Sequence, residues 1–221
     1  MPNILCVVTS HAEIDSEHTT GLWLEEFAGA FRIFRDAGCE VVTVSRHGGQ
    51  VPIDPRSRDA GGADDEEAAQ ALRTTQMLHQ AGDVLKYDAI YIPGGHGAMF
   101  DLAQSVPLKA LLSEFDAQGK IVASICHGPA AFVDAIRAGE PRTLVAGRRL
   151  TCFTNAEERE TGLADRMPFL LASKLREQGA KVVEGDSWSD HVEVDGKWVT
   201  GQNPQSTAST ARAILAALQA T

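Results

Sequence analysis

The chain has 221 residues, of which 43% are hydrophobic and 23% are charged. This composition is that of a packed, soluble protein, and the length suits one domain. Thirty acidic residues against twenty basic residues give a formal net charge of −10. Phosphate backbones and anionic lipid surfaces attract clusters of Lys and Arg, so this balance excludes nucleic acid and membranes as expected partners.

The sequence shows no pattern typical of a membrane segment, a signal peptide or a cysteine framework. No apolar run approaches the roughly 20 residues of a membrane helix, and no basic region precedes the first apolar run, so we expect no signal peptide. The four cysteines are widely spaced, with no CxxC pair, at Cys6, Cys39, Cys126 and Cys152. This pattern predicts neither a disulfide framework nor a zinc site, and it favours a reducing cytoplasm.

Short apolar runs alternate with helical stretches along the chain. The runs are β-rich and apolar throughout, which predicts strands of a parallel sheet buried on both faces, at residues 4–8, 41–44, 89–92 and 121–125. Each helical stretch between or after them is followed by Gly, the expected helix stop, and these stretches cover residues 22–37, 106–118 and 128–138. Strict alternation predicts an α/β sandwich with helices on both faces of a mostly parallel central sheet.

Two segments interrupt this alternation. Residues 48–82 read as a small insertion or cap segment, in which an acidic run leads into a helical stretch to about Ala81. Residues 192–199 read as a hairpin with Asp195-Gly196 at its turn. An Ala-rich helix is expected over residues 206–220. We therefore predict that residues 1–221 form a single domain.

The strongest chemical signal is Cys126, where a buried strand stops and a helix begins at once. Small residues around this point allow a tight turn that would expose the thiol, as in a nucleophile elbow. A thiol at a helix N-terminus is expected to ionise more readily, because the dipole and free amides favour thiolate. The adjacent His127 is a potential base.

A glycine-rich loop follows the preceding strand, in the sequence Pro93-Gly94-Gly95-His96-Gly97. Glycines let the backbone approach a substrate closely, and one amide of this loop could form an oxyanion hole with the amide of His127. Taken alone, the loop fits a plain strand–helix turn equally well.

The third signal is a carboxylate on an apolar helix face. When residues 21–37 are projected as a helix, Glu26 falls between Ile33 and Ala37 at the edge of the apolar arc, whereas Glu25 falls on the polar face. We expect Glu26 to turn inward, to be protonated, and to share a hydrogen bond with a nearby sulfur, since two anions would repel. An acid for His127 is expected from Glu157 or Glu158, and spacing does not distinguish them.

Five sequence blocks in order resemble the ThiJ/PfpI superfamily, whose domain is similar to that of class I glutamine amidotransferases. They lie at residues 20–27, 93–97, 125–129, 153–158 and 200–206, so the resemblance covers nearly the whole chain. The most similar branch comprises heat-shock chaperones with glyoxalase III activity. The resemblance implies a flavodoxin-like, three-layer α/β fold, a homodimer and no cofactor. The sequence itself shows no plausible metal cluster, so we expect no metal.

The resemblance also implies roles for individual residues. Cys126 would be the nucleophile, with His127 beside it and Glu158 as the acid of the triad. Glu26 would be the carboxyl beside the sulfur. The amides of Gly95 and His127 would bind the developing oxyanion, and the neighbouring Gly94 and His96 are candidate substrate-binding residues.

The expected function is a glutathione-independent glyoxalase that converts methylglyoxal and similar 2-oxoaldehydes to 2-hydroxy acids, here lactate, through a hemithioacetal on Cys126. A base, either His127 or Glu26, would move the proton between the two carbons. One alternative is a stress-response holdase or redox sensor, in which Cys126 is oxidised instead. A cysteine peptidase or amidase ranks lower, because Glu26 and aromatic walls suit a small carbonyl better than a peptide.

Overall fold

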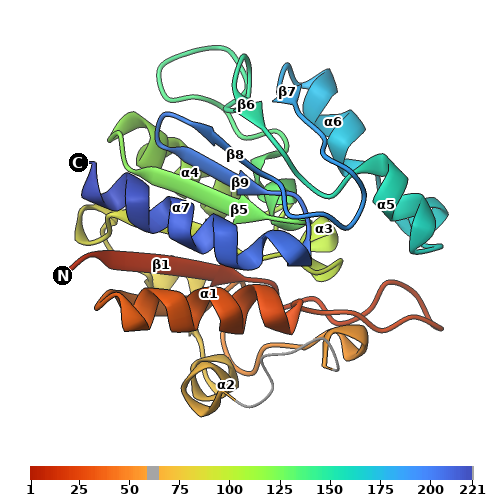
Figure 1. Ribbon diagram of the computed structural model, residues 1–221, viewed down its shortest axis with the longest axis horizontal. Coiled ribbons are helices and arrows are strands. Elements are labelled where there is room, and N and C mark those ends of the chain that lie inside the picture. Colours follow the sequence, from red (N-terminus) through yellow and green to blue (C-terminus); the bar gives the residue numbers. More distant parts are fainter. Residues whose placement is uncertain (59–64, 221) are drawn as a thin grey trace.

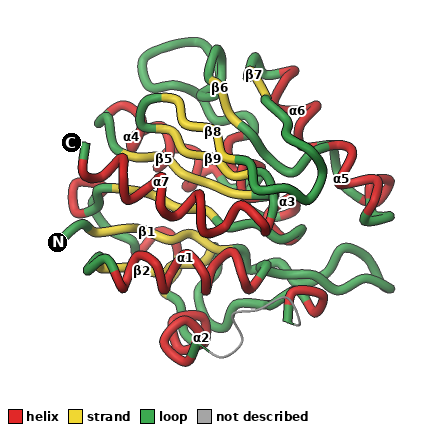
Figure 2. The backbone as a smooth tube through the Cα atoms, in the orientation of Figure 1, coloured by secondary structure: helices red, strands yellow, loops and turns green. Residues whose placement is uncertain are grey.

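The computed structural model describes residues 1–58 and 65–220. A seven-stranded sheet runs through this part of the chain in the order β3-β2-β1-β4-β5-β9-β8 (Figure 2). Its strands pair in parallel except β8, which is antiparallel to β9. The strands are β1 (Asn3–Val8), β2 (Glu40–Ser45), β3 (Gln76–Met77), β4 (Ala89–Ile92), β5 (Ile121–Ile125), β8 (Val192–Asp195) and β9 (Trp198–Gly201). A separate parallel pair joins β6 (Arg149–Leu150) to β7 (Lys181–Val182).

Helices cover both faces of the sheet (Figure 1). One face packs against α1 (Leu24–Asp36), α2 (Glu66–Arg73) and α7 (Thr207–Gln219). The other packs against α3 (Gly97–Phe100), α4 (Val106–Ala117) and α6 (Leu171–Glu177), while α5 (Asn155–Glu160) lies beside α6. The predicted flavodoxin-like, three-layer α/β sandwich is therefore confirmed. None of the described helices has the length and apolarity needed to cross a bilayer.

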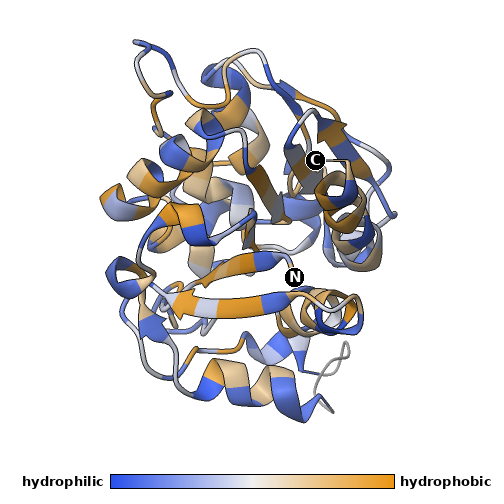
Figure 3. Cartoon of the chain, turned by 90° about the vertical axis from the view of Figure 1, so that its left-hand side faces the viewer, coloured by the Kyte–Doolittle hydropathy of each residue, from blue (hydrophilic) through white to orange (hydrophobic). Residues whose placement is uncertain are grey.

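The central strands supply side chains to two separate cores. In β5, Ile121, Ala123 and Ile125 belong to the core beneath α1 and α7, whereas Val122 belongs to the core on the α4 side. Successive residues of a strand point to opposite faces, so a strand covered on both sides must be apolar at every position. This is why the sheet is largely orange in Figure 3, and why its strands were recognisable as continuous apolar runs.

The hairpin of β8 and β9 forms as predicted, but the helix expected over residues 128–138 is wrong. A short 3-10 helix covers only Gly128–Phe132, and Val133 that follows is extended. Asp134 then adopts a left-handed conformation, with φ of 57°, and its amide donates to the side chain of Gln178. A left-handed residue cannot continue a right-handed helix, so tertiary contacts end it here.

The segment 48–82 is built into the sheet. Its helix α2 ends at Arg73, not near Ala81, because Thr74 is extended and β3 then pairs with β2 at the sheet edge. The same segment contains a 3-10 helix, Pro55–Ser57, capped by the Asp54 side chain. Its residues 59–64 lie outside the described part of the chain.

The carboxyl ends of the parallel strands lie side by side at one end of the sheet, which is where open α/β sheets bind ligands. The Gly94-Gly95 loop follows β4, and Cys126 follows β5 immediately. The turn after Cys126 is very tight: a Cβ on Gly128 would lie 2.2 Å from the carbonyl oxygen of Ile92 and 2.4 Å from Ser124 Oγ. Only glycine allows the chain to pass this close to β4.

Gly128→Ala is expected to destabilise the protein by about 3 kcal/mol or more, the upper end of overpacking costs, because the crowded atoms belong to a central strand. Urea denaturation of the variant measures this. Gly119→Ala is the matched control, since no atom lies within 4 Å of its Cβ position; it carries only the roughly 1–2 kcal/mol of a left-handed backbone. Equal destabilisation of the two variants would contradict the steric account.

Candidate active site

Cys126 occupies a strained position at the end of β5. Its φ is 59°, a left-handed conformation that is uncommon for a residue with a side chain. Two backbone hydrogen bonds hold it there: its amide donates to Gly201 O at 3.0 Å, and its carbonyl accepts from the Phe153 amide at 2.9 Å. The sheet on one side and the chain before α5 on the other thus impose the elbow expected from the sequence.

The thiol of Cys126 is nearly buried, with 3% of the residue exposed. Burial raises its pKa well above the ordinary value, and the Glu26 carboxyl raises it further, while a hydrogen bond from the Gly95 amide lowers it. The expectation of a stabilised thiolate is therefore wrong for the resting site. The helix that follows is a five-residue 3-10 turn, whose short dipole does not compensate for burial beside a carboxyl.

Glu26 is turned inward as predicted, and it is fully buried. Its Oε2 accepts a hydrogen bond from the Gly94 amide at 2.6 Å, and the Tyr91 hydroxyl ties α1 to β4 by donating to Glu26 O. Apart from the Cys126 thiol, which hydrogen-bonds to this carboxyl, Oε1 has no partner in the described chain. Burial raises the pKa of Glu26 to about 8, so the carboxyl is mostly protonated at neutral pH. Glu25 is half-buried, and it lines a separate cavity with Gly29 and Arg32.

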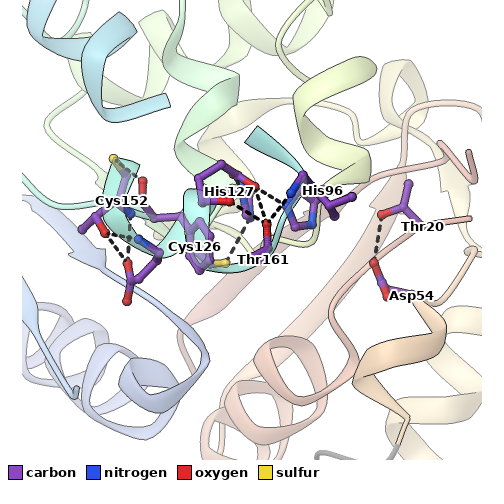
Figure 4. Close-up of polar contacts among 12 residues, drawn as sticks. Thr20, Asp54, His96, Cys126, His127, Cys152 and Thr161 are labelled. Carbon is purple, nitrogen blue, oxygen red and sulfur yellow. Dashed lines mark hydrogen bonds and ion pairs between the residues drawn. The ribbon is translucent and has the colours of Figure 1, made fainter. Parts of the chain in front are cut away.

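His127 lies between the sulfur and an acid. Its Nδ1 is 3.3 Å from Cys126 Sγ, and its Nε2 is 2.6 Å from Glu158 Oε2. A carboxylate at Nε2 favours the tautomer with its proton on Nε2, leaving the Nδ1 lone pair directed at the thiol. Figure 4 shows Cys126 and His127 side by side, with His96 and Thr161 next to them. The arrangement can accept the thiol proton.

A capping box decides which glutamate reaches His127. The Thr154 side chain accepts from the Glu157 amide, and Glu157 Oε2 accepts from the Thr154 amide in return. Glu157 is thereby held at the start of α5, and Glu158 is left to face the imidazoles. Although burial opposes its ionisation, His127 and then His96 hold the pKa of Glu158 well below its usual range. The Thr-x-x-Glu pattern of the capping box was the sequence signal that could have resolved this choice.

His96 contacts the other carboxylate oxygen of Glu158. Its Nε2 lies 2.8 Å from Glu158 Oε1, and its Nδ1 lies 3.1 Å from Arg56 Nη2. The guanidinium is always a donor, so Nδ1 must accept and Nε2 must carry the proton. Burial and the neighbouring His127 lower the pKa of His96 to about 4. His96 is therefore a neutral donor that fixes the carboxylate of Glu158.

The Gly94-Gly95 loop closes over the sulfur. Gly95 has a φ of 96°, and a Cβ at this position would lie 2.2 Å from Gly21 O, so both conformation and space require glycine. The Gly95 amide points at Cys126, and the Trp23 amide donates to Gly94 O at 3.1 Å. The loop thus joins the first two sequence blocks to the elbow, and it places an amide donor beside the reacting sulfur.

The seven residues expected at the site lie together, and three of them, His96, Cys126 and His127, line a cavity of about 270 Å³. Sequence reasoning missed several others that line it. They are Trp23, Arg56, Phe153, Glu160, Thr161, Trp188 and Pro204. Three are aromatic, and Thr161 Oγ1 donates to Glu158 Oε1 at 3.1 Å. The cavity wall is therefore largely apolar, with polar groups concentrated at the sulfur.

The site also contains three side chains with the chemistry of metal ligands, which the sequence spacing did not reveal. Ligand atoms of His96, His127 and Glu158 lie within 4.8 Å of one another. In the described geometry each imidazole already donates to one oxygen of Glu158. A metal would have to replace both of these protons, and it would withdraw His127 from Cys126. The donor set therefore fits a hydrogen-bonded triad better than a metal centre.

Comparison with known proteins agrees with this geometry. The model of the DJ-1/PfpI family matches residues 19–217. A glutathione-independent glyoxalase of Schizosaccharomyces pombe is 34% identical over 89% of this chain and 86% of its own length. Glyoxalase 3 of Candida albicans is 29% identical over 99% of both chains.

The crystal structure of glyoxalase III from Candida albicans superposes with a TM-score of 0.91 at 28% identity, covering 100% of this chain and 98% of that one. Rapid Encystment Protein 24 kDa of Francisella tularensis also has a TM-score of 0.91, at 33% identity and 99% coverage of both chains. The resemblance to ThiJ/PfpI proteins is thus confirmed, and the chain belongs to the DJ-1/PfpI family.

Proposed function

We propose that this chain is a glutathione-independent glyoxalase, which converts methylglyoxal and similar 2-oxoaldehydes to 2-hydroxy acids. The observation that carries the proposal is the pairing of two groups at one sulfur: the His127 imidazole 3.3 Å from Cys126 Sγ, and the buried Glu26 carboxyl on the Gly94 side. Relatives similar over most of the chain are named as glutathione-independent glyoxalases, which supports this assignment.

In the first step the Cys126 sulfur adds to the aldehyde carbon, C1, and His127 Nδ1 takes the thiol proton. The negative charge formed on the C1 oxygen is stabilised by the amides of Gly95 and His127. His127 then returns the proton to this oxygen, which gives a neutral hemithioacetal. A base at the sulfur is required here, because the resting thiol is protonated.

In the second step Glu26, in its ionised form, removes the proton from C1. The electron pair forms a C1–C2 double bond, and the C2 oxygen becomes an enolate that takes the hydroxyl proton from the C1 oxygen. Glu26 then delivers its proton to C2. C1 is oxidised to a thioester carbonyl while C2 is reduced to a secondary alcohol, so no external redox partner is needed.

In the last step water attacks the thioester carbonyl and His127 takes a proton from the water. The C–S bond then breaks, His127 returns this proton to the Cys126 sulfur, and the 2-hydroxy acid is released. The sum is one 2-oxoaldehyde plus one water giving one 2-hydroxy acid. No cofactor enters this sequence. We also propose a homodimer, which the family resemblance implies, and a single domain over residues 1–221, which the sequence pattern predicts. The cytoplasm as its location is a prediction from cysteine usage.

Two other readings fit the geometry less well. A redox sensor needs an exposed thiol of low pKa, whereas Cys126 is nearly buried and its pKa is raised by burial. A peptidase needs an open groove for an extended chain. The cavity here is small, and Trp23, Phe153 and Trp188 form its walls. A three-carbon dicarbonyl suits that space.

Removing the nucleophile should abolish the reaction. Cys126→Ala is expected to form no lactate from methylglyoxal, and Glu158→Gln is expected to lose about 10²–10⁴-fold in kcat/KM because His127 loses the partner that fixes its tautomer. Incubation without added thiol, with lactate enantiomers separated by chiral chromatography, measures both. Turnover by Cys126→Ala would refute the assignment.

Glu26→Gln should lose activity but gain stability, because the buried carboxyl that acts as the base also destabilises the fold when it ionises. The pKa of this carboxyl is raised from 4.5 to about 8 on folding. The contribution to stability is therefore complete below pH 4.5 and is lost as the pH rises to about 8, at about 1.4 kcal/mol for each pH unit. The variant lacks this loss, so its Tm relative to wild type should increase across that range.

The wild-type kcat/KM should rise with pH toward about 8, because the base is the ionised form of Glu26. Thermal unfolding and initial rates at matched pH values test both statements. Glu25→Gln is the control for activity, and it should turn over methylglyoxal at close to the wild-type rate. A Tm difference that stays constant with pH, or an active Glu26→Gln variant, would show that Glu26 is not this base.

A further inference from the structure

Arg56 is a fixed cation in the wall of the catalytic cavity. Its Nε and Nη2 donate to the two carboxylate oxygens of Asp54, at 2.9 and 2.6 Å, which is the bidentate geometry preferred by guanidinium. Nη2 also donates to His96 Nδ1 at 3.1 Å. One edge of the guanidinium is thus fully engaged, and its orientation is set.

The anchor of this cation is itself buried. The Asp54 side chain has no exposed surface, and it accepts a further hydrogen bond from Thr20 Oγ1 at 2.9 Å. Figure 4 shows Thr20 and Asp54 to one side of the catalytic histidines. Since a carboxylate is buried only when it is paired, Asp54 and Arg56 form a unit that holds a charge in place, unlike a solvated surface arginine.

The opposite edge of Arg56, at Nη1, makes no hydrogen bond to the described part of the chain. The side chain remains 41% exposed, and it lines the same cavity as Cys126. Among the lining residues it is the one with a permanent positive charge. Two N–H donors with a full charge therefore remain available on the side of the guanidinium away from Asp54.

A 2-oxoaldehyde has two oxygens, and the groups assigned so far serve one of them. The amides of Gly95 and His127 receive the oxygen on C1. When Glu26 removes the C1 proton, negative charge develops on the C2 oxygen, and this charge needs a donor of its own in a site walled by aromatic side chains.

We propose that Arg56 binds the C2 oxygen of the substrate through Nη1, which makes it the residue that selects dicarbonyls over simple aldehydes. The inference rests on the proposed glyoxalase function. A simple aldehyde can form the hemithioacetal at Cys126, but it offers no second oxygen to Arg56. A 2-oxoaldehyde gains one charge-assisted hydrogen bond on binding, and that bond strengthens as the enolate forms.

A competing role is indirect: Arg56 could act only by holding His96, and through it Glu158 and His127. Such a positioning role would impair the addition of every aldehyde to Cys126, because all of them need the His127 base. Binding of the C2 oxygen would impair dicarbonyls alone. Comparing the two classes of aldehyde therefore separates the roles.

The test compares Arg56→Met with Arg58→Met, an exposed arginine of the same segment that does not line the catalytic cavity. Two readouts are taken: kcat/KM for methylglyoxal, and the rate at which propanal protects Cys126 from iodoacetamide, which reports addition to the sulfur without turnover. Arg56→Met should lose about 100-fold in kcat/KM, as expected for one transition-state donor, and propanal protection should change less than threefold. Arg58→Met should match wild type in both. Arg56→Lys should recover part of the lost kcat/KM, since lysine restores the positive charge but not the planar, bidentate guanidinium group.

Equal loss of both readouts in Arg56→Met would overturn the inference, because the residue would then be acting through His96 or through folding. Wild-type kcat/KM in Arg56→Met would overturn it as well. Neither result touches the proposed function, which fails separately if the wild-type protein forms no lactate from methylglyoxal. In that event the proposed role of Arg56 toward dicarbonyls would be refuted together with the function. Identical propanal protection in wild type and Arg56→Met would then show only that the Cys126 thiol is reactive.

Discussion

The burial of two acids side by side, the Cys126 thiol and the Glu26 carboxyl, is the constraint on which the site depends. Two anions in a low-dielectric interior would repel strongly. Burial raises the pKa of both groups, and Glu26 raises that of Cys126 further, while the hydrogen bond from Cys126 lowers that of Glu26 in part. The resting pair is therefore neutral. A neutral thiol needs a base to become a nucleophile, and the base must lie on the side of the sulfur that Glu26 does not occupy. His127 lies there.

The positions of His127 and Glu158 depend on the different contacts that the adjacent Glu157 and Glu158 make. Glu157 is used for the helix itself: it completes the capping box with Thr154 and accepts hydrogen bonds from Gln202 and Asn203 after β9. This ties the start of α5 to the end of the sheet. Glu158, one residue later on the helix, is turned by about 100° and reaches both imidazoles. A helix cap thus aligns an acid with the nucleophile.

The parts of this arrangement that could be predicted from sequence are those set by local periodicity. Ile121 to Ile125 is apolar at every position because both faces of β5 are covered, and Glu26 was recognised as inward because its helix has a clear apolar arc. The helix expected over residues 128–138 failed because the left-handed Asp134 is held by Gln178, distant in sequence. Arg56 was missed because its importance comes from side-chain contacts with Asp54 and His96, and no periodic pattern marks it. The protonation of Cys126 could not be predicted either, because burial is a property of the assembled fold.

Several features of the site are unfavourable in isolation, and their position in the fold explains how they persist. Cys126 has a left-handed backbone, the Glu26 carboxyl is fully buried, and His96 is kept neutral by burial. Each costs stability, and the strained backbone alone costs on the order of 1–3 kcal/mol. All three lie where β4 and β5, fully buried on both faces, end at the middle of the sheet. A turn at the sheet edge, with fewer neighbours, could relax to remove such strain; between two packed layers the chain has no alternative path. The dense centre of the sheet is therefore what allows a protonated, strained Cys126 to be held beside Glu26 and His127.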